Sequence, residues 1–355
     1  FFVVGMADFP KLMRLRVDDE NMEKIHACAR KGQIDEVKRF VEQGVDPSIQ
    51  NKFGCTALHL ACKFGQVETA KFLSGICDCY GLWHGQKPLH LAVLSKKEEL
   101  VEALVAGAKE RGRNVELMLN EHDELHVSDI GGLDFHSDGQ TALHWCVALG
   151  SQYIPMLRLL LRLGASPTAK NKEGMTSLMY AIILKNEDAM EYMLDGVKPG
   201  QLRLDYQDKL GYTHLHHSIL NNREDYAMRF IELGHGLDQE DDNHQPPLFH
   251  ALRAAMVKLL AYLLQHVDTF AVQQAPFHNG SVMMPERIQW LPFATNEQDQ
   301  NECITLFQSR LSEVCAPQET TTRKKKGPLK MHLAPSAPVR KRSVGRNVGR
   351  GRSSK

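Results

Sequence analysis

A six-residue motif recurs along this chain at nearly constant spacing, and no other feature constrains the fold as strongly. Its clearest copy runs from Thr56 to Ala61 and reads Thr-Ala-Leu-His-Leu-Ala. Related motifs begin at Glu23, Lys87, Thr141, Thr176, Thr213 and the divergent Pro246. Their apolar third residues, from Ile25 to Leu248, are separated by 33, 31, 54, 35, 37 and 33 residues. Periods of this length indicate a repeat protein in which each unit packs on its neighbours.

Each motif predicts the start of a short helix, because a threonine hydroxyl at the N-cap accepts from the free amides of the first turn. A second apolar run follows each start, as in residues 67–73, 156–163 and 256–264. Glycines two residues before the motif predict tight turns: Gly54, Gly85, Gly139, Gly174 and Gly211. Gly44, Gly164 and Gly234 are placed to end second helices in the left-handed conformation. The predicted unit is a turn, a short helix, a longer helix and a loop, so the fold class is all-α.

The motif and its period resemble those of the ankyrin-repeat family, whose unit has about 33 residues and a threonine-proline-leucine-histidine type motif. The resemblance covers residues 20–270 as about seven repeats, and it is closest at residues 54–65 and 139–150. Three departures stand out. The interval from Leu89 to Leu143 holds about 20 extra residues, Met179 and Phe249 replace the histidine, and the two terminal copies are degenerate. The resemblance implies an ankyrin-repeat solenoid.

The sequence divides into four segments around this repeat domain. Residues 1–19 form an N-terminal extension, in which Met6 is a plausible true start and residues 1–5 an extension of the gene model. The ankyrin-repeat domain spans 20–270 with an insertion at about 111–136. Residues 271–319 form a loop and a helix from Glu297 to Val314 whose apolar face, with Cys303, Phe307 and Leu311, predicts a cap on the open end of the solenoid. Residues 320–355 form a basic tail.

Composition narrows the class of protein. Hydrophobic residues make up 43% and charged residues 24% of the chain, which is ordinary for a globular protein. No apolar stretch approaches the roughly 18 residues that would span a bilayer, so we expect no membrane partner. The eight cysteines show no disulfide framework. Reduced, buried thiols predict an intracellular protein, and we expect a cytoplasmic or nuclear location or both.

The net charge of zero results from two segments of opposite charge, an acidic body and a short basic tail. From residue 320 onward there are 12 Lys and Arg and no acid, which leaves 31 bases and 43 acids in the rest of the chain. The tail is rich in Gly, Pro, Ser and Arg and poor in large apolar residues, so we predict that it is disordered. Its two basic clusters resemble a two-part nuclear-import signal, while contact with RNA or another nucleic acid, or no specific role, stays open. The clusters are Arg323, Lys324, Lys325 and Lys326, and Arg340, Lys341 and Arg342.

The sequence carries no recognisable catalytic motif, phosphate-binding loop or dinucleotide fingerprint, so we predict that the protein is not an enzyme and uses no cofactor. The motif histidines His59, His90, His144 and His216 lie one repeat apart, and the resemblance implies a structural imidazole that bonds the motif threonine and adjoining backbone. Cys77, Cys79 and His84 have metal-ligand chemistry but match no known finger spacing, so we assign no metal site. The insertion is rich in acids and imidazoles and is a candidate for partner contact.

Recognition is the function that a solenoid of this kind predicts, because stacked units expose an extended surface of loop tips and first-helix side chains. Matching the motif repeat by repeat gives the expected contacts, with the aromatic residues as anchors. For each of them, packing on a neighbouring repeat remains the alternative. The expected contact residues are Phe53, Phe64, Trp83, His84, Leu149, Leu184 and Leu210.

We therefore predict a non-catalytic adaptor or scaffold that binds a partner protein through the ankyrin groove and loop tips, with a basic tail for nuclear import or anionic partners. The alternative is a nucleic-acid or ribonucleoprotein-associated factor in which the tail supplies the affinity. The two differ in salt dependence, since binding to nucleic acid through the tail should weaken steeply with salt.

Overall fold

The computed structural model describes residues 19–315, apart from residues 52, 78–80, 82, 84–85, 125–138, 198–200, 235–236, 267–271, 274 and 280–281. The N-terminal extension and the basic tail, with both of its clusters, lie outside the described residues, as do Cys79 and His84. The regular elements of the described part are helices apart from one hairpin of two-residue strands, which confirms the predicted all-α fold class.

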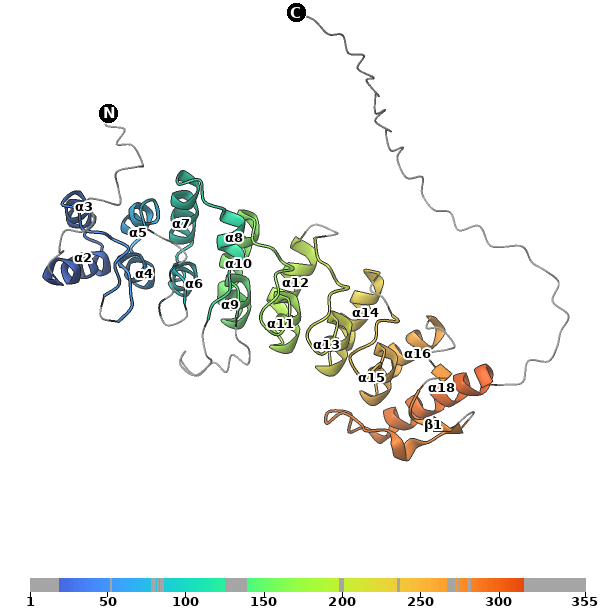
Figure 1. Ribbon diagram of the computed structural model, residues 1–355. Coiled ribbons are helices and arrows are strands. Elements are labelled where there is room, and N and C mark those ends of the chain that lie inside the picture. Colours follow the sequence, from blue (N-terminus) through green and yellow to red (C-terminus); the bar gives the residue numbers. More distant parts are fainter. Residues whose placement is uncertain are drawn as a thin grey trace, which may run out of the picture. The chain divides into compact units, whose positions relative to one another are not determined.

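Seven helix pairs follow one another, and we number them repeats 1 to 7 (Figure 1). The first helix of each pair, called the inner helix, begins at the motif: α2 (Asp19–Lys31), α4 (Ala57–Lys63), α6 (Pro88–Leu94), α9 (Ala142–Ala148), α11 (Ser177–Ile183), α13 (His214–Leu220) and α15 (Pro247–Arg253). The second, or outer, helices are α3 (Ile34–Glu42), α5 (Val67–Ser74), α7 (Glu98–Glu110), α10 (Ile154–Leu163), α12 (Glu187–Gly196), α14 (Glu224–Glu232) and α16 (Val257–His266).

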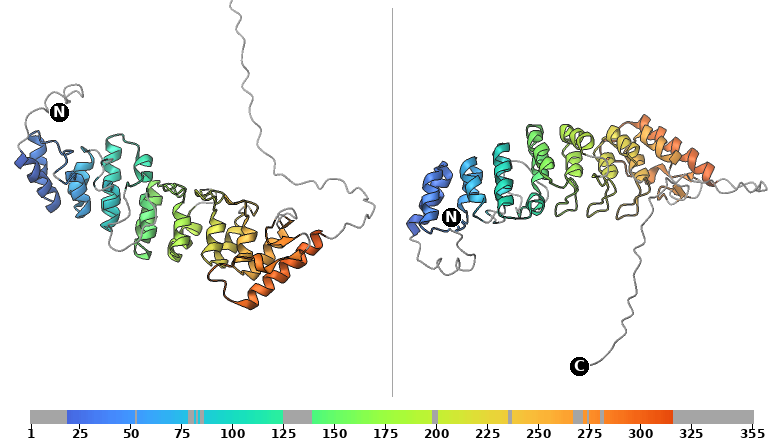
Figure 2. Two further views of the ribbon diagram at one scale, coloured as in Figure 1. Left: turned by 60° about the horizontal axis from the view of Figure 1, so that its bottom comes forward. Right: turned by 90° about the horizontal axis from the view of Figure 1, so that it is seen from above.

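Inner helices pack on inner helices, so each repeat is covered by the next. Contacts run from α2 to α4, α6, α9, α11, α13 and α15 in succession. The inner and outer helices form two rows, which Figure 1 shows and Figure 2 presents from two further directions. The motif leucines Leu58, Leu143, Leu178, Leu215 and Leu248 are all at most 1% exposed. The apolar third residue of the motif is therefore the core residue of each repeat.

The inner helices begin where the motif predicts. Thr56 caps α4 in an extended conformation, and its Oγ1 accepts from the backbone amide of His59. Thr176 and Thr213 cap α11 and α13 in the same way. The predicted left-handed glycines are also present, since Gly44, Gly164 and Gly234 have φ of 88°, 105° and 85°.

Hairpin loops precede the inner helices, and the loops of repeats 5 to 7 are bonded to one another through the backbone. Lys209 N donates to Glu173 O at 2.9 Å, and Asp242 N donates to Leu210 O at 3.1 Å. Gly211 adjoins this contact with φ of 78°, and a Cβ there would lie 2.6 Å from Asp242 N. His244 takes the same place in the last hairpin with φ of 57°, and its side chain is 88% exposed. A side chain therefore fits at residue 244 of the last hairpin, whereas at Gly211 it would collide with the backbone of the next hairpin.

We expect Gly211→Ala to lower the free energy of unfolding by about 2–3 kcal/mol, because the new Cβ adds a left-handed penalty and a clash with the next hairpin. The matched variant His244→Ala places alanine in the same backbone conformation without that clash and should cost less than about 1 kcal/mol. Urea unfolding of both variants measures the difference. Equal effects would show that the stacked hairpins do not depend on close approach at Gly211.

The long interval between repeats 3 and 4 contains an additional helix, α8 (Val115–Asn120), within the expected insertion at 111–136. Asp123 then occupies the place that Asn171 takes in repeat 5, since its Oδ1 accepts from the backbone of the following hairpin strand. Only 5 residues separate Asn171 from Thr176, whereas 18 separate Asp123 from Thr141. The extra chain thus has two parts, one containing α8 and one that lies in the sequence between Asp123 and Thr141.

Beyond repeat 7, the chain forms a short hairpin of β1 (His278–Asn279) and β2 (Val282–Met283) and then α18 (Glu297–Cys315). The 3₁₀ turns η1 (Ser151–Tyr153) and η2 (Pro285–Arg287) complete the described elements. Cys303, Phe307 and Leu311 of α18 are fully buried, and Val314 is partly buried. Because α18 contacts α15, α16 and β2, it covers the apolar end of the last repeat.

Candidate functional site

Five of the expected contact residues form two rows along the repeats. One row is at the hairpin tips, and the other is at the C-caps of the inner helices. Phe53 and Leu210 lie at hairpin tips and are 64% and 60% exposed. Phe64 and Leu184 are the C-cap residues of α4 and α11 and are 43% and 40% exposed. Leu149, the C-cap residue of α9, is half-buried. These residues are therefore at the repeat positions expected from the motif, and their contact with a partner stays a prediction.

Trp83 differs from the others because it makes several internal contacts. Its Nε1 donates to the carbonyl of Phe53 at 3.1 Å, and the ammonium of Lys63 lies 4.5 Å from its ring. The ring of His59 meets it edge to face at 6.5 Å. Trp83 is thus half-buried and joins two successive hairpins. Among the predicted anchors, Phe53 and Phe64 are the more exposed.

In repeats 2, 4 and 6 the motif histidine connects its repeat to the next. His59 Nδ1 lies 2.7 Å from Thr56 Oγ1, and its Nε2 donates to Gly81 O at 3.0 Å. His144 repeats this arrangement with Thr141 at 2.8 Å and Met175 O at 3.0 Å. The backbone amides of Thr56 and Thr141 also donate to Nδ1 of His59 and His144, each at 3.4 Å, so Nδ1 is an acceptor and the imidazole is neutral.

Burial reinforces the neutral form of these imidazoles. It lowers the pKa of His59 and His144 to about 4 and that of His90 to about 3. His216 makes the same pair of contacts, with Thr213 Oγ1 at 2.9 Å and Gln245 O at 3.3 Å. The contacts are those expected for structural histidines.

Repeat 5 lacks the motif histidine, and the next repeat supplies a replacement contact. Met179 stands at the histidine position, so Thr176 has no imidazole of its own repeat to bond. His214 of repeat 6 takes over, with Nε2 2.9 Å from Thr176 Oγ1 and Nδ1 3.2 Å from Leu204 O. The departure at Met179 is therefore compensated across the repeat boundary.

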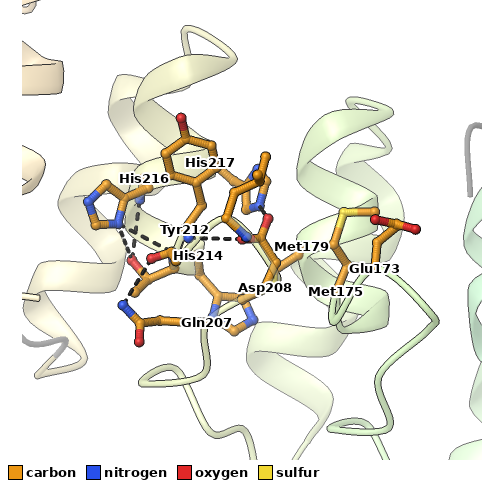
Figure 3. Close-up of polar contacts among 12 residues, drawn as sticks. Glu173, Met175, Met179, Gln207, Asp208, Tyr212, His214, His216 and His217 are labelled. Carbon is orange, nitrogen blue, oxygen red and sulfur yellow. Dashed lines mark hydrogen bonds and ion pairs between the residues drawn. The ribbon is translucent and has the colours of Figure 1, made fainter. Parts of the chain in front are cut away.

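A second set of polar contacts fixes the hairpins, and sequence analysis did not predict it. In repeats 6 and 7 an aspartate at the base of the hairpin pairs with a histidine nine residues later. Asp208 Oδ2 lies 2.9 Å from His217 Nε2, and Asp241 Oδ2 lies 3.0 Å from His250 Nε2. All four side chains are at most 8% exposed. Figure 3 shows the first pair, together with Tyr212, whose backbone amide donates to Asp208 Oδ1.

The hairpin-base position of Asp208 and the inner-helix position of His217 vary together from repeat to repeat. Asp123 Oδ2 accepts from Trp145 Nε1 at 2.7 Å, and Trp145 stands where His217 and His250 stand in their repeats. Asparagine replaces the aspartate in the repeats where this position holds Leu60 or Tyr180. The backbone contacts stay the same, since Asn51 Oδ1 accepts from Phe53 N and Cys55 N. Aspartate thus occurs where an indole or imidazole N–H meets its second oxygen.

The acids and imidazoles that open the insertion make internal contacts. Glu121 forms an ion pair with Lys87 at 2.8 Å, and His122 Nε2 donates to Lys170 O at 2.7 Å. Asp123 is 2% exposed, and burial raises its pKa. Within the part of the chain that the structure describes, no group of three His, Cys, Asp or Glu residues is arranged to hold a metal ion. None of the described helices is long and apolar enough to cross a membrane.

Comparison with known proteins agrees with the repeat architecture. The family model described as ankyrin repeats (3 copies) matches residues 25–114 and 108–203, which is about half of the chain. A solved structure of an ankyrin repeat protein from Leishmania major is 54% identical and superposes with a TM-score of 0.72. The similarity covers 84% of this chain and 99% of that one.

Curated relatives are more distant. The B-cell lymphoma 3 protein homolog of Mus musculus is 26% identical over 183 residues, which cover 51% of this chain and 37% of that protein. The transient receptor potential cation channel subfamily A member 1 of Homo sapiens is 26% identical over 246 residues, which cover 66% of this chain and 20% of the channel. This chain therefore spans well under half of the length of these relatives. It belongs to the ankyrin-repeat family, whose repeats are protein–protein interaction modules.

Proposed function

We propose that this chain is a non-catalytic adaptor that binds a partner protein through its hairpin tips and the ends of its inner helices. The observation that carries this proposal is the repeat register of its exposed apolar side chains. Phe53 and Leu210 share the hairpin-tip position, while Phe64 and Leu184 share the C-cap position. A single exposed leucine is uninformative, whereas apolar residues recurring at equivalent positions form rows that one partner can follow. Leu149, which is half-buried, lies in the C-cap row. Trp83, also half-buried, adjoins Phe53 through its hydrogen bond to the Phe53 carbonyl, and His84 is included on its sequence position alone.

The basic tail supports a second part of the proposal, that the adaptor enters the nucleus. The clusters from Arg323 to Lys326 and from Arg340 to Arg342 have the spacing of a two-part import signal. This part rests on the sequence only.

The adaptor function is tested by recovering partners from cell extract. Changing Phe53, Phe64, Leu184 and Leu210 together to serine should reduce the recovery of specific partner proteins at least tenfold, because buried apolar anchors dominate binding energy. Matched control changes are Leu117→Ser and Leu233→Ser, which alter leucines that are 55% and 54% exposed and lie outside the two rows. Their effect should be less than twofold.

The same experiment distinguishes the alternative. The chain truncated after residue 319 should retain its partners if the solenoid binds them. If recovery instead needs only the tail and disappears after nuclease treatment, nucleic acid is the partner and the adaptor function is wrong.

A further inference from the structure

Three surface concavities lie along the turns between inner and outer helices and the starts of the outer helices in repeats 4 to 7, and the middle one opens between the outer helices α12 and α14. We call this surface the turn edge (residues 149–151, 184–188, 221–226 and 254–258). One concavity lies at each successive repeat junction. Their volumes are about 450 Å³ between repeats 4 and 5, about 260 Å³ between repeats 5 and 6, and about 340 Å³ between repeats 6 and 7. None of them involves the hairpin tips.

The two outer concavities combine apolar lining with polar groups. Val147, Ala148 and Leu184 contribute to the first. The last is lined by Ala254, Ala255, Met256, Val257 and Phe293. Leu184 is 40% exposed. Each can therefore receive an apolar side chain of a partner.

The middle concavity is polar and already contains ion pairs. Arg223 pairs with Glu187 at 2.6 Å, and Arg229 pairs with Glu191 at 2.8 Å and also with Asp195. Tyr226 OH donates to Glu191 at 2.9 Å. An apolar side chain placed here would remove these charges from water at considerable cost. The middle position suits a polar or charged residue of the partner.

The charge along this edge favours a basic partner. Six carboxyl groups line the three concavities against four cationic groups. Both arginines and two of the carboxylates, Glu187 and Glu191, are held in the ion pairs above, which leaves four carboxylates against two lysines. Asp188 and Asp225, each the second residue of an outer helix, are exposed and take no part in those pairs. The chain up to residue 319 also has 43 acids against 31 bases. A segment rich in Lys and Arg is complementary to this surface.

We propose that the turn edge of repeats 4 to 7 binds an extended, basic segment of a partner protein through two apolar anchors, one in each outer concavity. Stacked helices lie about 10 Å apart, so the two anchors are separated by about 20 Å. An extended chain covers that distance in about six residues. The partner segment thus carries two large apolar residues about six positions apart, with Lys or Arg between and beside them. This inference rests on the proposed function in taking the partner to be a protein.

The test is a selection from phage-displayed random 16-residue peptides on the immobilised full chain, followed by affinity measurement with synthetic fluorescein-labelled copies. Enriched peptides should show the apolar spacing and a net positive charge. Asp188→Lys with Asp225→Lys should weaken their binding at least tenfold, and Leu184→Ser at least fivefold. The matched control is Asp35→Lys with Glu68→Lys, because these exposed acids hold the same helix position in repeats 1 and 2. It should change affinity less than twofold.

Two results would overturn the inference. One is enrichment of peptides without this pattern, and the other is equal loss of affinity in the two charge-reversed variants. Neither result affects the adaptor function, because Phe53→Ser with Leu210→Ser changes hairpin-tip residues that lie outside the turn edge and tests that function separately. If that double variant loses its partners while the turn-edge variants keep them, the adaptor function holds and the turn edge is not its binding surface.

Discussion

Lowering the pH from 7.5 to 5 is expected to remove about 6 kcal/mol from the free energy of unfolding. His59 and His144 have pKa values of about 4 in the folded chain, and His90 has a pKa of about 3, in each case chiefly because of burial. An imidazole in the unfolded chain has a pKa of about 6.5. Between these values the unfolded chain binds more protons, so stability is lost as the pH falls below 6.5.

At pH 5 each of these histidines contributes about 2 kcal/mol of the loss. Since a folded domain is stable by about 5–15 kcal/mol, the chain should approach its unfolding midpoint near pH 5. Urea unfolding followed by circular dichroism at pH 7.5, 6 and 5 measures the effect. His144→Gln, which cannot be protonated, should show a pH dependence smaller by about 2 kcal/mol. Stability that stays constant between pH 7.5 and 5 would contradict neutral, buried imidazoles.

His217→Leu should destabilise the protein by about 3 kcal/mol at pH 7.5, because it leaves the Asp208 carboxylate buried without its partner. Burial is the largest single influence and raises the pKa of Asp208. The hydrogen bond and charge interaction with His217, together with the backbone amides of Tyr212 and Leu210, bring the pKa below its ordinary value. Adding Asp208→Asn should restore most of the lost stability. The chain itself supplies the precedent, since Asn51 and Leu60 hold these two positions in repeat 2.

Urea unfolding of the single and double variants measures this coupling. Asp208→Asn alone completes the double-mutant cycle, because it separates the effect of losing the carboxylate charge from the effect of losing the imidazole. A double variant as unstable as His217→Leu would show that the imidazole stabilises repeat 6 by packing and not by pairing with the carboxylate.

Most of the fold was predictable because one motif reports both the start of the inner helix and its buried face. The register also predicted exposure for Phe64 and Leu184, which the structure shows as C-cap residues, whereas Leu149 at the same repeat position is half-buried. The repeat register did not predict that Trp83 is half-buried. Its exposure depends on the carbonyl of Phe53 and the ammonium of Lys63 in the preceding repeat, and neither contact follows from helix periodicity.

The hairpin-fixing pairs were missed although their signal is present in the sequence. Asp208 and His217, and Asp241 and His250, share a separation of nine residues, which becomes visible only when repeats are compared position by position. Helix α8 and the β1–β2 hairpin were not predicted either. Both lie outside the repeat period, so the motif gives no register for them, and strands of two residues carry no periodicity of their own.

Because backbone bonds join successive hairpins, the path of the chain at the tips does not depend on which side chains the tips carry. Lys209 N and Asp242 N fix the tips through main-chain groups, which every residue except proline provides. The tip side chains can therefore be exchanged without changing the course of the chain. A surface built in this way can acquire a new partner by substitution at a few exposed positions, while the stacking that holds the repeats together stays untouched.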